Sequence, residues 1–327
     1  LINGTNHNDN GGKYFKEGAI RYALEFFIDT LHLSKDRVFI TIFKGNKSIP
    51  RDKESFKIWQ GNGIRKERIR EFKEDNFWGP VGDTGPCGPS SEIHYDKGEE
   101  FGCRNPDCGP NCPRCHRFVE LWNLVFMEYW KDEEGNYKKL PQKNVDTGIG
   151  FERLVAVLQQ KPSAYETDLF LPIYEAVSAS SSIDKEKLPK EFLRVLADHI
   201  RGACFLISEG ILPSNLDRGY ILRRILRRAI RYAKLLKLKE KWYIDPVKKI
   251  VEIYSDIYPE IKANEERIIT VVQNEEEKFG KTLEAGLKEL HKIFYWLQEI
   301  QKAKDVILER KRMPINPLEN AKELGKK

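Results

Sequence analysis

The spacing of apolar residues changes near residue 165, and this change limits the chain to folds with two different parts. Before it, residues 13–32 carry apolar side chains at steps of three and four, while residues 38–44 are β-branched or aromatic in strand-like order. After it, four segments have helical spacing with little strand signal: 189–208, 216–238, 243–257 and 262–303. We therefore predict an α+β domain over residues 1–165 and a helical domain over residues 166–327.

Within the first part, further strands are predicted at residues 91–96 and 118–130, with a turn and a returning strand at 135–139. Residues 78–89 are rich in Gly and Pro, which predicts a loop with several sharp turns. Residues 148–159 indicate a glycine-rich strand or loop that runs into a helix. From Arg310 onward the sequence is polar and poorly patterned, which predicts a C-terminal tail.

Composition narrows the class of protein. The chain has 327 residues, of which 40% are hydrophobic and 32% charged, so it can bury a sizeable core. We find no apolar run long enough to span a bilayer and no secretory signal at the start, so no membrane partner and a cytoplasmic location are expected. The net charge of +6 is too small to prove a nucleic-acid partner by itself.

Four of the six cysteines, Cys103, Cys108, Cys112 and Cys115, fall within thirteen residues, with His116 adjacent. Short loops let four thiolates converge on one tetrahedral Zn²⁺, and no position is left open for catalysis. We predict a structural zinc knuckle at residues 102–116 that folds a loop without a core. The alternatives are reduced thiols or a redox-sensitive knot. Cys204 stands apart and is predicted to be a buried core thiol.

The segment from Asn144 to Arg153 packs a carboxylate, two glycines and an arginine into ten residues. Glycines let a ligand approach the backbone, and an arginine at a helix start can clamp a phosphate. A glycine-rich turn into a capped helix would produce the same pattern, in which case Asp146 is a turn or cap residue.

Residues 218–239 hold nine Lys or Arg residues. On a helical wheel, Ile221, Leu222, Ile225, Leu226, Ala229, Ile230 and Ala233 fill one half, and the basic residues fill the other. Like charges at four-residue spacing destabilise a helix, so either nearby acids or a nucleic-acid backbone should offset them.

Six segments, in order, resemble the alanine-specific class II aminoacyl-tRNA synthetases. They are KYFKEGAIRYALEFF (13–27), DNFWGPVGDTGPCGPSSEIHYD (75–96), LWNLVFMEYW (121–130), NVDTGIGFERLVAVLQ (144–159), ADHIRG (197–202) and PSNLDRGYILRRILRRAIR (213–231). The resemblance implies part of a class II antiparallel sheet with flanking helices, followed by an all-helical tRNA-binding domain. It implies ATP-dependent activation of alanine with Mg²⁺, then transfer of the alanyl group to tRNA(Ala).

The resemblance also implies a role for individual residues. Arg153 matches the motif 3 arginine that holds the ATP phosphates, and Gly150 keeps the loop open for ATP. Asp146 matches the acid that pairs with the alanine ammonium. Asn123 is expected to hydrogen-bond the amino acid, Trp78 to wall the side-chain pocket and Gly148 to leave room beside it. Judged from the residues alone, Trp78 would be a core residue and Asn123 a strand-edge residue.

For tRNA, the resemblance implies that the basic helix binds the acceptor stem and that Asn215 helps to read a G·U wobble pair in its shallow minor groove. The residues expected to contact RNA are Asn215, Arg218, Arg223, Arg224, Arg227, Arg228 and Arg231.

The sequence also departs from the family. LINGTNHNDNGG stands where motif 1 and most of motif 2 are expected, no candidate for the motif 2 arginine precedes Arg21, and the editing domain is not recognised. We expect a fragment with impaired adenylate formation and no correction of mischarged tRNA. Two rivals remain open: a non-catalytic synthetase-like RNA-binding protein, and a zinc-stabilised scaffold with no RNA role.

Overall fold

The computed structural model describes residues 2–3 and 14–312, and the chain folds as two compact units, Leu1–Leu171 and Pro172–Lys327. Each unit is described by itself. The segment 4–13, which holds most of LINGTNHNDNGG, and the segment 313–327, which holds most of the predicted tail, lie outside the described residues.

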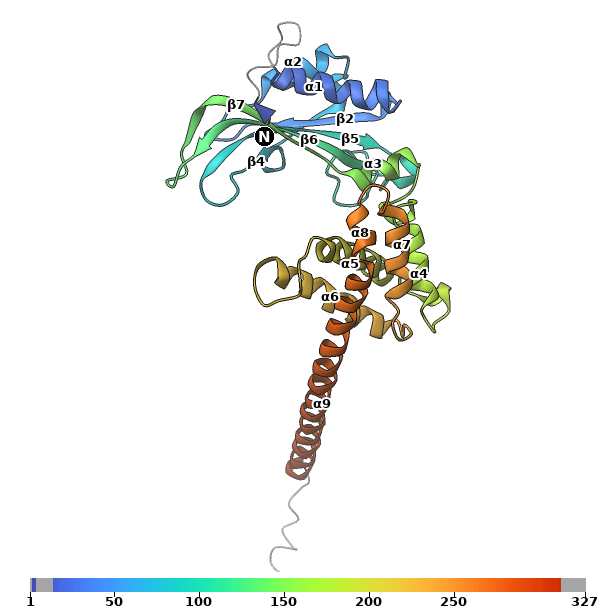
Figure 1. The fold of residues 1–327 in the computed structure, drawn as a ribbon. Helices are drawn as coiled ribbons and strands as arrows, with labels where there is room; N and C mark the ends of the chain where they lie inside the picture. Colours follow the sequence, from blue (N-terminus) through green and yellow to red (C-terminus); the bar gives the residue numbers. More distant parts are fainter. Residues whose placement is uncertain (1, 4–13, 313–327) are drawn as a thin grey trace, which may run out of the picture. The chain divides into compact units, whose positions relative to one another are not determined.

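The first unit is built on a sheet with the strand order β1-β7-β6-β5-β2-β3, and β4 pairs with β5 off this path (Figure 1). The strands are β1 Ile2–Asn3, β2 Val38–Phe43, β3 Ile69–Phe72, β4 Phe77–Trp78, β5 Gly85–Asp96, β6 Phe118–Lys131 and β7 Tyr137–Ile149. All pairings are antiparallel except β2–β3, which is parallel. The predicted strands at 38–44, 91–96 and 118–130 are therefore confirmed.

One face of the sheet is covered by helices α1 (Lys16–Leu24) and α2 (Lys53–Gly61) and by the π-helical turn η1 (Glu25–Thr30), as Figure 1 shows. The apolar steps predicted for residues 13–32 supply this cover, because Ala19, Ala23 and Phe27 are buried in the core. On the sheet side, Ile40, Ile93, Leu124, Phe126 and Val145 meet them. Burying this apolar face is what holds α1, η1 and α2 on the sheet.

A buried lysine joins these layers. The ammonium of Lys16 lies 3.0 Å from Asp52 Oδ1 and 2.7 Å from Glu128 Oε1, and its side chain is 5% exposed. Burial lowers the pKa of Lys16, but the two carboxylates together raise it by more than burial lowers it. The pKa of Lys16 therefore lies above its ordinary value. Glu128 Oε2 also lies 3.1 Å from Nζ of Lys143 on β7. Helix α1, helix α2 and the β6–β7 pair are therefore tied together at one point.

Two sequence-based predictions in this unit were right only in part. The predicted loop at 78–89 is confirmed for residues 79–84. Trp78 instead ends β4 and residues 85–89 begin β5, because extended backbone here pairs Trp78 with Gly88 and Cys87 with Tyr129. Gly88 permits this arrangement: a Cβ at that position would lie 1.9 Å from the carbonyl oxygen of Phe126. The returning strand expected at 135–139 is longer, running as β7 to Ile149 and then directly into helix α3 (Phe151–Leu158).

The second unit is helical around the buried residues of α5 (Lys190–Ser208), which contacts α6 (Asp217–Leu235), α7 (Ile244–Tyr254), α8 (Pro259–Ala263) and α9 (Glu265–Arg312). A helix not predicted from the sequence, α4 (Leu171–Ala179), joins the two units in sequence. The four predicted helices are confirmed, but α9 continues to Arg312 where a tail was expected from Arg310. Cys204 is fully buried, as predicted.

Within the described residues, none of these helices combines the length and apolar character that a membrane crossing requires.

Candidate functional site

Strands β6 and β7 place three predicted site residues on one face of the sheet. Asn123 pairs with Gly148, and Val125 pairs with Asp146. Paired residues of an antiparallel ladder point to the same side, and successive residues alternate, so Asn123, Asp146 and Gly148 share the face opposite the helical layer. Leu124 and Val145, one position along, point into the core.

This face is open beside Gly148. A Cβ at Gly148 would have no atom within 4 Å, and the residue is exposed. Asp146 is half-buried, two residues away on the same strand. An acid, an amide and an empty space therefore lie within one short stretch of the sheet.

A buried carboxylate supports this stretch from the neighbouring strand. Glu92 on β5 pairs with Asn123 across the ladder and is 6% exposed. Its Oε1 accepts a hydrogen bond from Asn123 Nδ2 at 3.3 Å, and its Oε2 accepts one from Thr41 Oγ1 at 2.8 Å. His94 Nε2 lies 3.0 Å from the same Oε2, and Asn76 Nδ2 donates to Thr41 Oγ1 at 2.8 Å.

These hydrogen bonds leave three buried atoms of the network without a partner among the described residues: Asn76 Oδ1, His94 Nδ1 and Asn123 Oδ1. Asn123 Oδ1 is buried and makes no hydrogen bond with the residues described. Buried polar atoms are nearly always hydrogen-bonded. Of the three, Asn123 belongs to the residue that pairs with Gly148 at the open face, so its Oδ1 is the candidate position for a ligand donor.

Sequence reasoning missed this polar network of Asn76, Thr41, Glu92 and His94. The available signal was SEIHYD, in which Glu92 and His94 alternate with apolar Ile93 and so share one face of a strand. Which face they share depends on the pairing of β5 with β2 and β6, and that pairing is not visible in the sequence.

Gly150 and Arg153 lie where β7 becomes α3. The Gly150 N–H donates to Leu121 O at 2.9 Å, which extends the β6 pairing past the end of β7. Arg153 lies in the first turn of α3, where its Nη1 donates to Glu120 O at 3.1 Å and to Glu120 Oε2 at 3.0 Å. The Arg153 side chain is 56% exposed, and an ion pair this exposed is weak enough for a ligand phosphate to exchange with it.

The predicted residues thus follow the line of β6. Asp146 pairs with Val125 of β6, and Gly148 pairs with Asn123. Gly150 bonds to Leu121, and Arg153 bonds to Glu120. At about 3.3 Å per residue this line is about 16 Å long, which suits an elongated ligand rather than a compact one. Trp78 is half-buried and pairs with Gly88 of β5, on the other side of β6 from Asp146. Its role as a pocket wall stays a prediction.

The four clustered cysteines converge in the loop before β6. Their sulfur atoms all lie within 4.8 Å of one another, with Cys103 Sγ 3.7 Å from Cys112 Sγ and Cys108 Sγ 3.5 Å from Cys115 Sγ. Four sulfurs around Zn²⁺ at ~2.3 Å would be about 3.8 Å apart, so the residues fit that ion. A hydrogen bond from the Arg114 N–H lowers the pKa of the Cys112 thiol to about 6, whereas burial and a hydrogen bond with Cys115 raise the pKa of the Cys108 thiol to about 12. Of these two, Cys112 is the one biased towards the thiolate that a metal needs.

Comparison with known proteins identifies the family. A family model described as tRNA synthetases class II (A) matches residues 5–310. The chain belongs to this family. Its sheet with flanking helices, and the helical region that follows in the sequence, confirm the fold expected from the six sequence segments.

Two similar proteins are alanine–tRNA ligases. The chain is 46% identical over 280 residues to the alanine–tRNA ligase of Natranaerobius thermophilus, covering 84% of this chain and 31% of that protein. It is 43% identical over 296 residues to the alanine–tRNA ligase of Borrelia hermsii, covering 88% of this chain and 49% of that protein. The chain therefore spans about a third to a half of the length of these relatives.

In this class II synthetase chain, the predicted RNA-binding residues lie on α6 and the loop before it. Gly219 lets that loop pack directly against the first turn of α6, because a Cβ at this position would lie 2.5 Å from Leu212 O. Asn215 is exposed and accepts a hydrogen bond from Arg223 Nη1. Loop and helix are thereby held together with Asn215 at the surface.

The face of α6 only partly matches the predicted wheel. Leu222, Leu226, Ala229, Ile230 and Ala233 are buried as expected. Ile221, which was placed in the apolar half, is instead 51% exposed. It lies at the edge of that half, about 100° around the helix from Leu222, which is fully buried.

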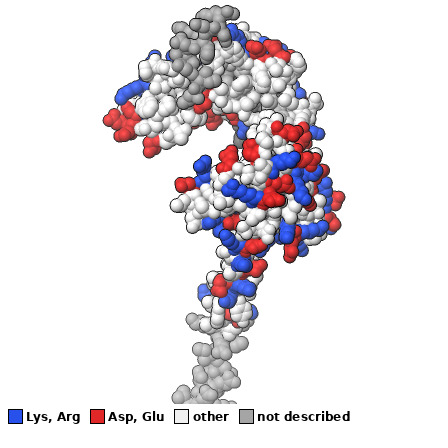
Figure 2. Space-filling model, in the orientation of Figure 1, with Lys and Arg blue, Asp and Glu red and all other residues white. Residues whose placement is uncertain are grey.

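The basic side chains of α6 divide into two groups. Arg227 Nε donates to Glu275 Oε1 on α9 at 2.6 Å, so an acid offsets this charge within the chain. Arg218, Arg224, Arg228 and Arg231 are exposed and make no ion pair with any described acid. Figure 2 shows basic and acidic side chains mixed over the visible face of the helical unit. The expectation that acids balance the helix holds for Arg227 and for Lys234, whose Nζ lies 3.8 Å from Glu284 Oε1. It holds in part for Arg228, whose charge helps to lower the pKa of Asp198, and not for the other three.

Proposed function

We propose that this chain contributes alanine activation and tRNA(Ala) recognition to an alanine–tRNA ligase. Alanine and ATP give alanyl-adenylate and pyrophosphate, and the alanyl group then moves to the 3′ end of the tRNA. The observation that carries the proposal is the pairing of Asn123 with Gly148, which puts an orphan acceptor and the Asp146 carboxylate beside an open space.

The amino acid would bind at this open space. The carboxylate of Asp146 pairs with the alanine ammonium, and Asn123 Oδ1 accepts a second hydrogen bond from it. The missing side chain at Gly148 leaves room for the ligand backbone, while Trp78 limits the size of the side chain that fits. The Asn123 amide is already fixed by Glu92, so little conformational freedom is lost on binding.

The nucleotide would extend from this point along β6. Gly150 allows ATP to approach the backbone, and Arg153 leaves Glu120 to hold the phosphates, as a guanidinium suits phosphate oxygens. Mg²⁺ bound with ATP neutralises phosphate charge. Adenylate formation then needs the alanine carboxylate to be positioned against the α-phosphate rather than a covalent step by the protein.

The acceptor stem would bind to α6. Phosphates of the stem would be bound by the exposed arginines Arg218, Arg224, Arg228 and Arg231. Asn215 lies at the surface in the loop before α6 and would reach base edges in the shallow minor groove. Arg223 orients Asn215, and Arg227 anchors α6 to α9. Both arginines would therefore position the RNA-binding surface rather than contact the RNA. Zn²⁺ held by Cys103, Cys108, Cys112 and Cys115 would fold the loop before β6.

A second candidate is tRNA binding without catalysis. It is favoured by the exposed arginines of α6, which lie in a different unit from the β6–β7 site and need no activation chemistry. Alanine-dependent exchange of pyrophosphate into ATP, with glycine and serine as comparison, separates the two. Exchange with alanine supports the ligase, and tRNA binding without exchange supports the second candidate.

The residue-level test is Asp146→Asn. Removing the charge partner of the ammonium costs about 1.5–3 kcal/mol, so kcat/KM for alanine should fall about 10- to 100-fold. Asp29→Asn is the matched control, because Asp29 is exposed on η1, in the layer covering the other face of the sheet. Equal activity of both variants would refute the role of Asp146.

A further inference from the structure

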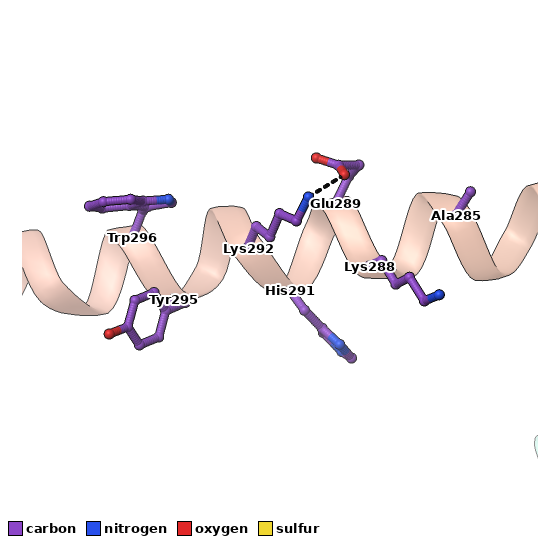
Figure 3. Close-up of a pocket in the computed structure, with 7 residues that line it drawn as sticks. All are labelled: Ala285, Lys288, Glu289, His291, Lys292, Tyr295 and Trp296. Atoms are coloured by element: carbon purple, nitrogen blue, oxygen red, sulfur yellow. Dashed lines mark hydrogen bonds and ion pairs between the residues drawn. The ribbon is translucent and has the colours of Figure 1, made fainter.

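The C-terminal half of α9 has an exposed apolar surface with no partner among the described residues. The first turns of α9 are packed, with Ile268 and Val272 fully buried, and Lys234 of α6 reaches as far as Glu284 at 3.8 Å. Beyond that point Figure 1 shows α9 extending past α5, α6 and α7. Figure 3 shows the rings of Tyr295 and Trp296 projecting from opposite sides of this bare helix.

Apolar residues on this stretch follow a seven-residue repeat. The first series is Leu283, Leu290, Leu297 and Lys304. The second series is offset by three residues and consists of Gly286, Ile293, Ile300 and Ile307. Leu287 and Phe294 flank them. Apart from Leu283, the apolar members are between 44% and 60% exposed. We call these residues the α9 seam. Such a repeat, sustained over three heptads, is the pattern by which one helix pairs with another.

We propose that the α9 seam binds the α9 seam of a second copy of this chain, with the two helices antiparallel about a two-fold axis near Tyr295. The axis pairs Leu290 with the second copy's Ile300, and Ile293 with its Leu297. This proposal does not depend on the proposed function.

The direction follows from Lys304 and Gly286. In the antiparallel pair, each Lys304 lies opposite the Gly286 of the second copy. The space beside Gly286 is open, since a Cβ there would have no atom within 4 Å, so the ammonium can reach solvent. In a parallel pair, Lys304 would meet Lys304. Two antiparallel helix dipoles also attract, whereas parallel ones repel.

The size of the seam agrees with a two-helix contact. A half-exposed side chain of this kind leaves roughly 80 Å² to bury, so two seams would remove about 1,300 Å² from water, within the ~1,200–2,000 Å² of stable interfaces. Because this lies near the lower limit, we expect dimers to form at chain concentrations of roughly 10–100 µM.

Sedimentation equilibrium of the full chain over about 2–200 µM tests the proposal. The apparent mass should rise from 38.1 kDa towards twice that value as concentration increases. The double variant Ile293→Glu, Leu297→Glu puts charges into the seam and should weaken association by at least ~100-fold. Tyr295→Glu is the matched control: Tyr295 is 60% exposed but lies off the seam, so its association should be unchanged.

A mass of 38.1 kDa at every concentration, or a dimer that survives the double variant, would overturn the proposal. Cross-linking then tests the direction and needs no destabilising change. A Gly286→Cys chain mixed with a Lys304→Cys chain should form an interchain disulfide above the level of the unsubstituted chain. A disulfide between two Lys304→Cys chains would show a parallel pair and refute the antiparallel arrangement.

Discussion

Replacing Glu92 by Gln tests whether this carboxylate sets the direction of the Asn123 amide. Glu92 Oε2 faces Thr41 and His94, and Oε1 accepts from Asn123 Nδ2. Gln offers only one carbonyl oxygen. If that oxygen stays with Thr41 and His94, the new NH₂ group meets the NH₂ group of Asn123. The Asn123 amide must then rotate, and a donor replaces the free acceptor Oδ1 at the open face.

The structure sets the size of the two expected effects. Hydrogen bonds to a charged group contribute ~1.5–3 kcal/mol, and Glu92 is 6% exposed, so we expect Glu92→Gln to destabilise the sheet unit by about 2 kcal/mol. Rotating the amide removes one hydrogen bond to the alanine ammonium and places two donors together. We therefore expect the KM for alanine to rise about tenfold, while the KM for ATP changes little.

Thermal unfolding and the alanine and ATP dependence of pyrophosphate exchange measure these effects separately. Glu67→Gln is the control, because Glu67 is exposed on a short 3₁₀ turn of the same unit. An unchanged melting temperature would show that Glu92 is not held as a carboxylate. An equal rise of both KM values would show that it supports the whole sheet rather than the Asn123 amide, and either result would refute the reasoning.

Three further predictions concern other parts of the chain. We expect about one zinc per chain by elemental analysis, and Cys112→Ser should abolish it and make residues 102–116 sensitive to protease. Replacing Arg224 and Arg231 by Gln should reduce the slope of log tRNA affinity against log salt by about 1.5–2, and an unchanged slope would exclude phosphate contacts there. Burial raises the pKa of Asp96, but hydrogen bonds from Arg117 and a backbone N–H lower it more. This stabilisation is present above the unfolded pKa of about 3.9 and is lost as pH falls through the lower folded pKa. Asp96→Asn should therefore cost about 2–3 kcal/mol at pH 7 and progressively less as the pH falls below about 4, as urea unfolding over this range can check.

The sequence predicted elements well where periodicity alone decides them. Helices α5, α6 and α7 and strands β2 and β6 were found because apolar spacing reports burial directly. Residues 85–89 were assigned to a loop because Gly and Pro usually break strands. Here the crowding of Gly88 against Phe126 O requires a glycine inside a strand.

The candidate site was predicted as residues but not as an arrangement. Family resemblance selected Asn123, Asp146 and Gly148, yet only the β6–β7 register shows that they share a face. Glu92 was missed because a buried acid has no mark in the sequence apart from its strand position. The exposure of Ile221 was also missed, since this residue lies at the edge of the apolar half and a helical wheel does not show how much of that half the neighbouring helices cover.

The irregular pairing of β6 and β7 has a consequence for how the protein can change. Residues 122–127 pair with 149–144 in one register, while 129–131 pair with 139–137 in another. Glu128 lies at the change between them, held by Lys16 of α1 and Lys143 of β7. The register at Asp146 therefore differs from the register beside the hairpin turn, and the Lys16 ion pair holds Glu128 where the two meet. We therefore expect insertions or deletions near Gly135 to be absorbed at this joint, so that the hairpin tip can accept a short tag without moving Asp146 off its face.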